Sequence, residues 1–223
     1  MTGDWTKTLL VIFDCDGVLV DSEPTSNRVM ARAITEAGLR MTPEEVAAAF
    51  QGMRLRDMQA EVERRLGRTL PDTWLETFEH ERAAAFEEEL KPVDGIADVL
   101  QQVRAAGTPF CVASQASTSK MELTLGLTGL CAFFAVERIF SSTMVHHGKP
   151  APDLFLHAAG AMGFDADRCV VVEDGVAGAE GARRAGMKCY GYAPTATRRD
   201  ALAAAGAETF SSMEQLSQLL GLR

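Results

Sequence analysis

Several kinds of segment are missing from this 223-residue sequence, and each absence argues against a class of function. No apolar run approaches the ~20 residues of a membrane-spanning helix. Residues 1–5 have neither the basic head nor the apolar core of a signal peptide. Acidic residues outnumber basic ones by 31 to 22, and no lysine-rich stripe is present to bind nucleic acid. We therefore expect a protein that binds neither membranes nor nucleic acids.

Closely spaced cysteine pairs are also missing. The five cysteines are widely separated, odd in number and include no Cys-x-x-Cys pair. This pattern argues against a disulfide framework or a zinc site and is typical of reduced thiols in a cytoplasmic protein. We expect the cysteines to lie in the core, and Cys15 to face away from the two aspartates beside it.

Short apolar runs alternate with helical patterns over most of the chain. Alternation of this kind predicts an α/β protein with a Rossmann-like parallel sheet and helices on both faces. The predicted strands cover 8–13, 109–113, 169–173, 188–192 and 207–210, and the predicted helices between them cover 96–106, 120–126, 153–162, 177–185 and 198–205.

Residues 22–91 interrupt this alternation. They contain no convincing strand, and helical spacing recurs over 27–38, 43–50, 56–66 and 74–89. We therefore expect a core formed by 1–21 and 92–223, with an inserted α-helical cap domain at 22–91. Because the insert directly follows the first strand, the sequence predicts that it covers the carboxyl end of the sheet as a lid.

The most informative motif follows the first predicted strand, where an apolar run ends in Asp14 and Asp16. Side chains alternate along a strand, so two carboxylates one residue apart point the same way. Gly17 then allows the backbone to turn and to approach a ligand closely. The pair predicts a magnesium site, a nucleophile or both. The alternative is two solvated turn acids at the end of a strand.

Two further segments can bind a phosphoryl group. Ser114 follows the predicted strand at 109–113 and offers a hydroxyl at a helix start, although an ordinary helix cap has the same pattern. Lys149 lies between Gly148 and two nearby prolines. A lysine in such a rigid loop can neutralise a phosphoryl group and a carboxylate together. The alternative for Lys149 is a solvated surface residue.

Another pair of acids, Glu173 and Asp174, lies at the end of the predicted strand at 169–173. Buried carboxylates are costly unless they are paired or bind a cation. Because the carboxyl ends of parallel strands meet at one edge, Asp174 is expected near Asp14. These two carboxylates and the main-chain carbonyl of Asp16 can supply the oxygen ligands that Mg²⁺ prefers.

These motifs, in this order, resemble those of the haloacid dehalogenase-like superfamily, and the helical insert resembles the cap of the subgroup that includes β-phosphoglucomutase and many small-molecule phosphatases. The resemblance implies that Asp14 attacks phosphorus and becomes an aspartyl phosphate, and that Asp16 serves as acid and base. It implies that Ser114 and Lys149 hold the phosphate oxygens. It also implies that Glu173 belongs, with the other acids, to the Mg²⁺ site.

Asp16 separates the branches of the family. Members that cleave haloacids typically have tyrosine at this position, and members that cleave phosphonates have a small residue there and a lysine in the cap. This chain keeps the acid and has no cap lysine before Lys91, so we expect phosphate-ester chemistry. A binding protein without turnover would be expected to lose one of the catalytic residues, and all of them are present.

A phosphatase and a mutase remain alternatives. The arginine that grips a second phosphate in the mutases falls three residues after Gly52, where this chain has Leu55. This departure favours a phosphatase of a small phosphorylated metabolite, such as a sugar or sugar-acid phosphate, over a β-phosphoglucomutase-type mutase. The candidate substrate contacts are Gly17, Gln115, Arg54 and Arg56. The sequence leaves the oligomeric state open.

Overall fold

The computed structural model describes residues 9–50, 53 and 55–222. The chain divides into two compact units, one formed by Met1–Val20 with Pro92–Arg223 and the other by Asp21–Lys91. They are called the core unit and the helical unit below. None of the described helices is long and apolar enough to cross a membrane.

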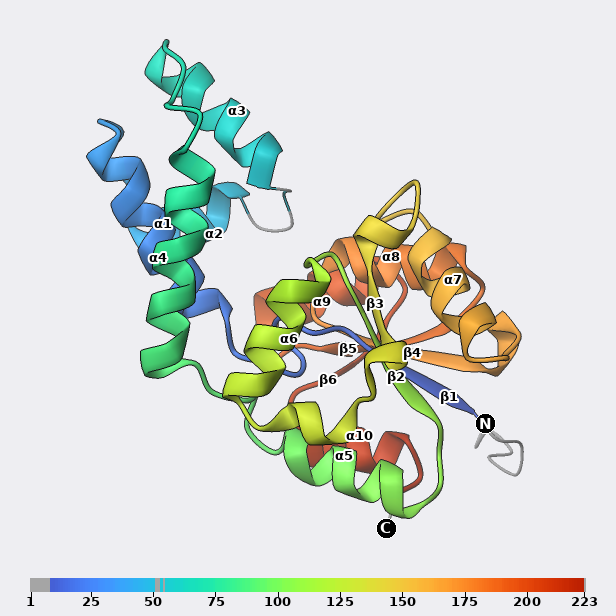
Figure 1. Cartoon of the computed structure of the whole chain (residues 1–223). Coiled ribbons are helices and arrows are strands. Elements are labelled where there is room, and N and C mark those ends of the chain that lie inside the picture. Colours follow the sequence, from blue (N-terminus) through green and yellow to red (C-terminus); the bar gives the residue numbers. More distant parts are fainter. Residues whose placement is uncertain (1–8, 51–52, 54, 223) are drawn as a thin grey trace. The chain divides into compact units, whose positions relative to one another are not determined.

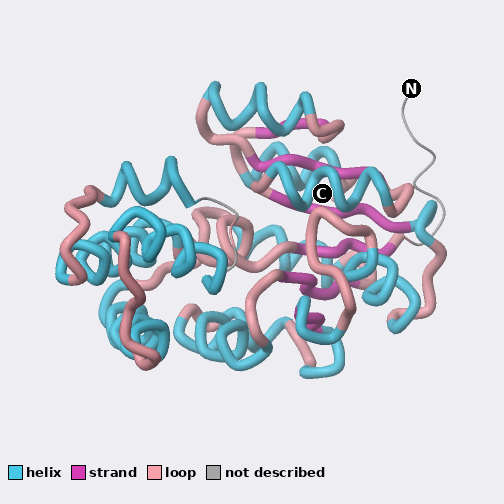
Figure 2. The backbone as a smooth tube through the Cα atoms, turned by 90° about the horizontal axis from the view of Figure 1, so that it is seen from above, coloured by secondary structure: helices cyan, strands magenta, loops and turns pink. Residues whose placement is uncertain are grey.

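The described part of the core unit contains a six-stranded parallel sheet with the strand order β3-β2-β1-β4-β5-β6 (Figures 1 and 2). Its strands are β1 (Leu10–Phe13), β2 (Phe110–Ser114), β3 (Ile139–Ser141), β4 (Cys169–Glu173), β5 (Lys188–Tyr192) and β6 (Glu208–Phe210). In the centre, Phe13 of β1 lies beside Val112 of β2 and Val172 of β4. The residues that follow these three strands therefore leave the sheet side by side.

Helices cover both faces of the sheet, as a parallel sheet requires. The longer helices of the core unit are α5 (Ile96–Ala105), α6 (Thr118–Leu127), α7 (Asp153–Ala161), α8 (Val176–Arg184), α9 (Ala196–Ala204) and α10 (Met213–Leu219). Figure 1 shows α7 and α8 on one side of the sheet and α5 and α10 on the other. Leu10 and Ile12 of β1 belong to one buried cluster with Leu154 of α7. Towards the other face, Phe13 meets Phe110 edge to face.

The helical unit has its own apolar core. It consists of α1 (Glu23–Glu36), α2 (Pro43–Phe50), α3 (Leu55–Leu66) and α4 (Trp74–Glu89). Ile34, Val62 and Phe78, from three of these helices, are buried in one cluster. A capping box starts α2: Thr42 Oγ1 accepts a hydrogen bond from Glu45 N at 3.2 Å, and Glu45 Oε2 accepts one from Thr42 N at 2.8 Å.

The predicted α/β class with a parallel sheet is confirmed, and the differences concern short or terminal segments. β3 and α10 are not predicted from the sequence, because they are too short to develop a clear periodicity. The sequence pattern predicts that the first helix starts at residue 27, whereas α1 begins at Glu23 with a proline in its first turn. Proline suits that position because the first-turn N–H groups have no partner within the helix. Thr8, the first residue of the first predicted strand, lies outside the described residues.

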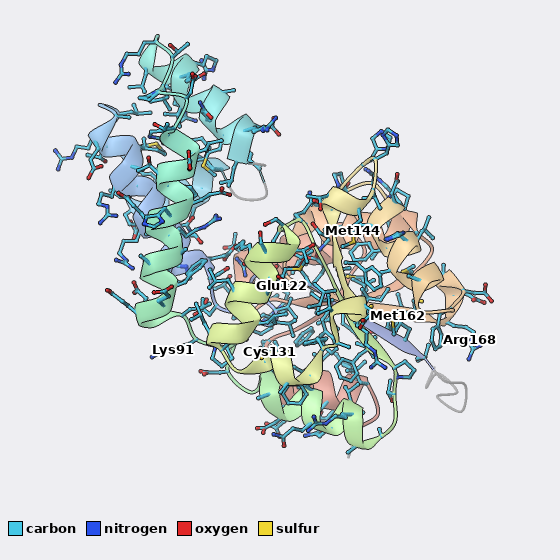
Figure 3. All side chains as sticks on the ribbon, in the orientation of Figure 1. Lys91, Glu122, Cys131, Met144, Met162 and Arg168 are labelled. Carbon is cyan, nitrogen blue, oxygen red and sulfur yellow. The ribbon has the colours of Figure 1, made fainter. Side chains whose placement is uncertain are left out.

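The five cysteines are free thiols, but they do not all lie in the core. Cys131 is exposed, so the prediction of a buried residue is wrong there (Figure 3). It lies in a short 3-10 turn, Leu130–Phe133, in which Leu130 is the buried residue. Cys15 packs its Sγ 3.9 Å from Thr124 Oγ1. Burial, followed by the charges of Asp16 and Asp14, raises the pKa of the Cys15 thiol, so it is a poor nucleophile.

Two leucines of α7 provide a matched test of the core. Leu154 is fully buried against the sheet, whereas 45% of Leu156 is exposed. We expect Leu154→Ala to lower the free energy of unfolding by about 2–5 kcal/mol, because it leaves a cavity. Leu156→Ala should change it by less than about 0.5 kcal/mol. Urea unfolding of both variants measures the difference, and equal losses would contradict this assignment of the core face.

Candidate active site

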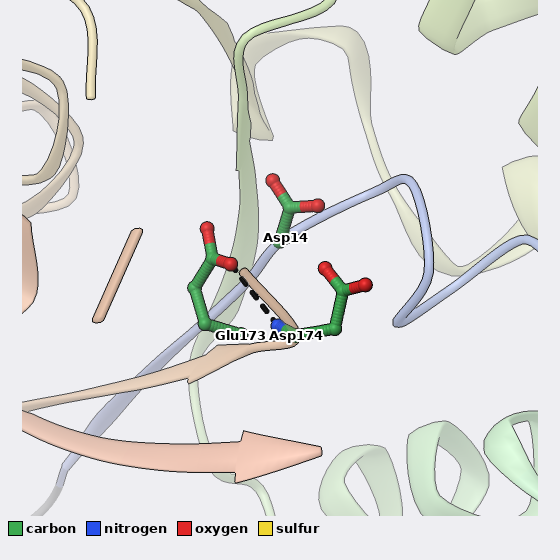
Figure 4. Close-up of side chains that lie close together, drawn as sticks. All are labelled: Asp14, Glu173 and Asp174. Carbon is green, nitrogen blue, oxygen red and sulfur yellow. Dashed lines mark hydrogen bonds between the residues drawn. The ribbon is translucent and has the colours of Figure 1, made fainter. Parts of the chain in front are cut away.

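A buried acidic cluster lies at the carboxyl ends of β1 and β4. Asp14, Glu173 and Asp174 each offer an oxygen within 4.8 Å of the others (Figure 4). The strand register explains this proximity, because Phe13 pairs with Val172 and Asp14 N donates to the carbonyl of Val172 at 2.9 Å. Clustered carboxylate oxygens are the ligands that a hard divalent cation prefers, so the residues fit Mg²⁺.

Lys149 contacts two of these acids. Its ammonium group donates to Asp14 Oδ1, to Glu173 Oε1 at 2.5 Å and to the carbonyl of Ala113 at 2.9 Å. Burial alone would lower the pKa of Lys149, but the two carboxylates outweigh it and raise this pKa above its ordinary value. The lysine is therefore a fixed positive charge beside Asp14, as its rigid loop predicts.

The pKa of Asp14 is raised to about 7. Burial is the largest cause, because a carboxylate loses its hydration inside the protein. Lys149 opposes this effect, while the charges of Glu173 and Asp16 add to it. A divalent cation bound here would favour the ionised form of Asp14.

Main-chain N–H groups hold Glu173 in place. Its Oε2 accepts hydrogen bonds at 3.0 Å from the N–H groups of Asp174 and Gly175, the first of which is dashed in Figure 4. Its Oε1 accepts from Lys149. Because both oxygens are engaged, this arrangement favours Glu173 as the residue that holds Lys149, while its predicted contact with a metal stays a prediction.

Gly17 brings the loop after β1 against Asp174. Its φ is +83°, a conformation that side chains disfavour. A Cβ there would lie 2.2 Å from Asp174 Oδ2, so a larger residue would displace the carboxylate. The structure thus gives a steric reason for the glycine, and the predicted contact of Gly17 with a substrate stays a prediction.

Ser114 is the last residue of β2, and Gln115 follows it. Ser114 is buried, and its Oγ accepts a hydrogen bond from Ala116 N at 3.2 Å. Gln115 donates from Nε2 to the carbonyl of Lys149 at 3.1 Å and accepts from its N–H at 3.2 Å. Gln115 therefore supports the main chain of Lys149. The predicted contact of Gln115 with a leaving group stays a prediction.

The two predicted cap arginines are in the helical unit. Arg54 lies outside the described residues. Arg56 is exposed in the first turn of α3. Their contact with a substrate stays a prediction.

Two cations that contact the acids of the site are not predicted from the sequence. Lys120 Nζ donates to both oxygens of Asp16, at 2.8 and 2.7 Å. Arg198 Nη1 donates to Asp174 Oδ2 at 3.0 Å. Each cation lies in the first turn of a helix, α6 or α9, that follows a strand. That placement is the one signal in the sequence that could have indicated them.

A buried aspartate bonded to a lysine, beside a second acid pair at the carboxyl ends of the central strands of an α/β sheet, is typical of an enzyme active site. The chain belongs to the haloacid dehalogenase-like hydrolase family, whose model matches residues 8–186. The resemblance on which the sequence analysis relied is therefore confirmed.

Two relatives from Escherichia coli are named as phosphatases. The chain is 33% identical over 210 residues to a 6-phosphogluconate phosphatase, and the match covers 94% of this chain and 93% of that protein. It is 28% identical over 177 residues to a fructose-1-phosphate phosphatase, covering 79% and 92%, respectively. The predicted enzyme class, a phosphoric monoester hydrolase, agrees with these relatives.

Two solved structures have the same fold over nearly the whole chain. A haloacid dehalogenase-like protein from Agrobacterium tumefaciens is 36% identical with a TM-score of 0.83, and the match covers 96% of this chain and 98% of that one. A family hydrolase from Deinococcus radiodurans, solved with bound phosphate and sodium, is 32% identical with a TM-score of 0.78, covering 95% and 94%. The second shows that a member of this family binds both an anion and a cation.

Two helical glycines test the packing around Glu173. A Cβ at Gly178 of α8 would lie 1.9 Å from the Glu173 carboxyl group, whereas a Cβ at Gly160 of α7 would meet nothing within 4 Å. We expect Gly178→Ala to lower the free energy of unfolding by about 1–3 kcal/mol through overpacking. Gly160→Ala should raise it by about 0.5–1 kcal/mol, because alanine favours a helix. Thermal unfolding of the two variants checks this, and a stabilised Gly178→Ala protein would contradict the packing described.

Proposed function

We propose that this protein is a Mg²⁺-dependent phosphatase that hydrolyses a small sugar or sugar-acid phosphate through an aspartyl phosphate on Asp14. The observation that carries the proposal is the placement of Asp14, buried at the end of the central strand and bonded to Lys149. A carboxylate beside a fixed cation and further acids suits attack on an anionic ester.

The proposed reaction has two halves. In the first, an oxygen of Asp14 forms a bond to phosphorus, the ester P–O bond breaks, and Asp16 gives a proton to the leaving alkoxide. In the second, Asp16 takes a proton from water as the water oxygen attacks phosphorus, which frees Asp14 and inorganic phosphate. In this proposal Lys149 and Ser114 stabilise the phosphoryl oxygens, where negative charge accumulates.

The proposed Mg²⁺ ligands are Asp14, the main-chain carbonyl of Asp16, and Asp174, with Glu173 beside them. When bound, the ion would neutralise the charge that opposes the approach of a carboxylate to a phosphate. Lys149 cannot supply all of this neutralisation, because it already contacts two carboxylates. Burial and neighbouring acids raise the pKa of Asp14 to about 7, which is why a cation at this cluster benefits the ionised nucleophile.

The substrate class rests on the relatives and on the division of the chain. The E. coli relatives are named for 6-phosphogluconate and fructose 1-phosphate. We assign the helical unit, Asp21–Lys91, as the cap that selects the leaving group. The free thiols are typical of a reducing compartment, and we extend the proposal to a cytoplasmic enzyme.

Phosphate release from a panel of sugar phosphates, sugar-acid phosphates, polyol phosphates and nucleotides tests the proposal. The panel includes β-glucose 1-phosphate, with isomer formation followed in the same samples. Rapid, Mg²⁺-dependent phosphate release from one sugar class is the expected result. Isomer formation with little free phosphate would instead establish the mutase alternative.

Replacement of the proposed nucleophile gives a direct test. We expect Asp14→Asn to lower turnover by at least about 10³-fold, because an amide cannot form the acyl phosphate. The variant should keep a cooperative thermal transition, since the amide is neutral and fits a site that disfavours charge. The exposed Asp167→Asn serves as the control and should keep wild-type turnover. Substantial activity in Asp14→Asn would refute the nucleophile assignment.

Metal dependence can be tested at Asp174. We expect Asp174→Ala to raise the Mg²⁺ concentration for half-maximal activity by about 10- to 100-fold, because one ligand of the ion is lost. Calorimetric titration of Mg²⁺ into the protein without substrate gives a second readout. An unchanged affinity in both measurements would place the metal elsewhere.

A further inference from the structure

One lysine holds the second aspartate of the motif. Lys120 Nζ lies 2.8 Å from Asp16 Oδ1 and 2.7 Å from Asp16 Oδ2, so a single ammonium group contacts both carboxylate oxygens. The two side chains are 19% and 26% exposed, so the pair is partly shielded from water. A carboxylate held through both oxygens has a defined plane as well as a defined position.

The helix that carries Lys120 is anchored on both sides of this contact. Ser117 caps its N-terminus and accepts a hydrogen bond from Lys120 N at 3.3 Å. Met121 and Leu125 are fully buried. One turn later, Thr124 donates to the carbonyl of Lys120 at 3.0 Å and lies 3.9 Å from Cys15 Sγ. α6 is therefore packed against the same loop that carries Asp16.

We propose that Lys120 is a positioning residue, which fixes the orientation of the Asp16 carboxylate for its proton transfers. This inference rests on the proposed function, in which Asp16 gives a proton to the leaving oxygen and later takes one from water. Both transfers need the carboxylate oxygen to face one point beside the phosphorus on Asp14, and misplacement of a reacting group by about 1 Å can cost about 10²-fold in rate. Lys120 acts through Asp16 and does not contact the substrate.

A double-mutant cycle tests this role with the substrate that the panel identifies. We expect Lys120→Met to lower kcat by about 10- to 100-fold in the wild-type protein and to change KM by less than about threefold. In the Asp16→Asn background, the same change should lower kcat by less than about twofold, because the group that it positions is already lost. Lys120→Arg, which keeps the charge, should recover part of kcat.

Lys188 supplies the matched control. It forms an exposed ion pair with Glu208 at 3.0 Å, at the start of β5 and away from the carboxyl ends of the strands. Lys188→Met removes a charge of the same kind and should leave kcat unchanged. Thermal unfolding of all variants separates a loss of positioning from a loss of fold.

Three outcomes would overturn the inference. An equal loss of kcat in both backgrounds would mean that Lys120 does not act through Asp16. A rise in KM as the main effect would make Lys120 a substrate ligand, and a wild-type kcat in Lys120→Met would remove any role. The proposed function fails separately, if Asp16→Asn alone keeps the wild-type kcat.

Discussion

The gathering of carboxylates at one end of a buried sheet is the constraint on which the rest of the site depends. Asp14 and Glu173 lie next to each other at the carboxyl ends of the neighbouring strands β1 and β4, and both are buried. Like charges so close are tolerated when cations and N–H groups are held among them. Lys149 lies between the two acids, and the hydrogen bonds of Gln115 fix the main chain of Lys149. The Lys149 ammonium group and the main-chain N–H groups after Glu173 thus compensate for the negative charge at the ends of β1 and β4.

This constraint also explains how far sequence reasoning could reach. An apolar run that ends in acids is a local pattern, so the central strands, Asp14 and the acid pair at 173–174 were predictable. The partners of these acids were less visible. Lys120 meets Asp16 across 104 residues of sequence, and no local periodicity marks a residue for such a contact. The sequence predicts Gln115 as a substrate contact. Its partner in the structure is the Lys149 backbone, whose position depends on how a distant loop folds.

The two units differ in how much substitution they can tolerate. The core unit contains the charged cluster, where even a small added group causes a steric clash. A methyl group at Gly17 would collide with Asp174. The helical unit has a separate apolar core, so its surface can vary without disturbing the acids. If the helical unit selects the leaving group, as proposed, this separation would let its surface change without altering the reaction centre. Arg56 is exposed on the helical unit, where a substitution does not disturb the buried acids.

The strand order has a consequence for synthesis on the ribosome. β1 is among the first parts of the described chain to be made, yet it pairs with β2 and β4, and Lys149 is 135 residues away from Asp14. The nascent β1 therefore has no neighbour in the sheet until β2, near the middle of the chain, has been translated, and β4 follows later still. Closing such long loops is slow. In that interval an apolar strand is exposed and open to aggregation. During this time Asp14 and Asp16, which follow β1, are charged and hydrated, and their charge favours solubility. Asp14 becomes buried only when the sheet is complete.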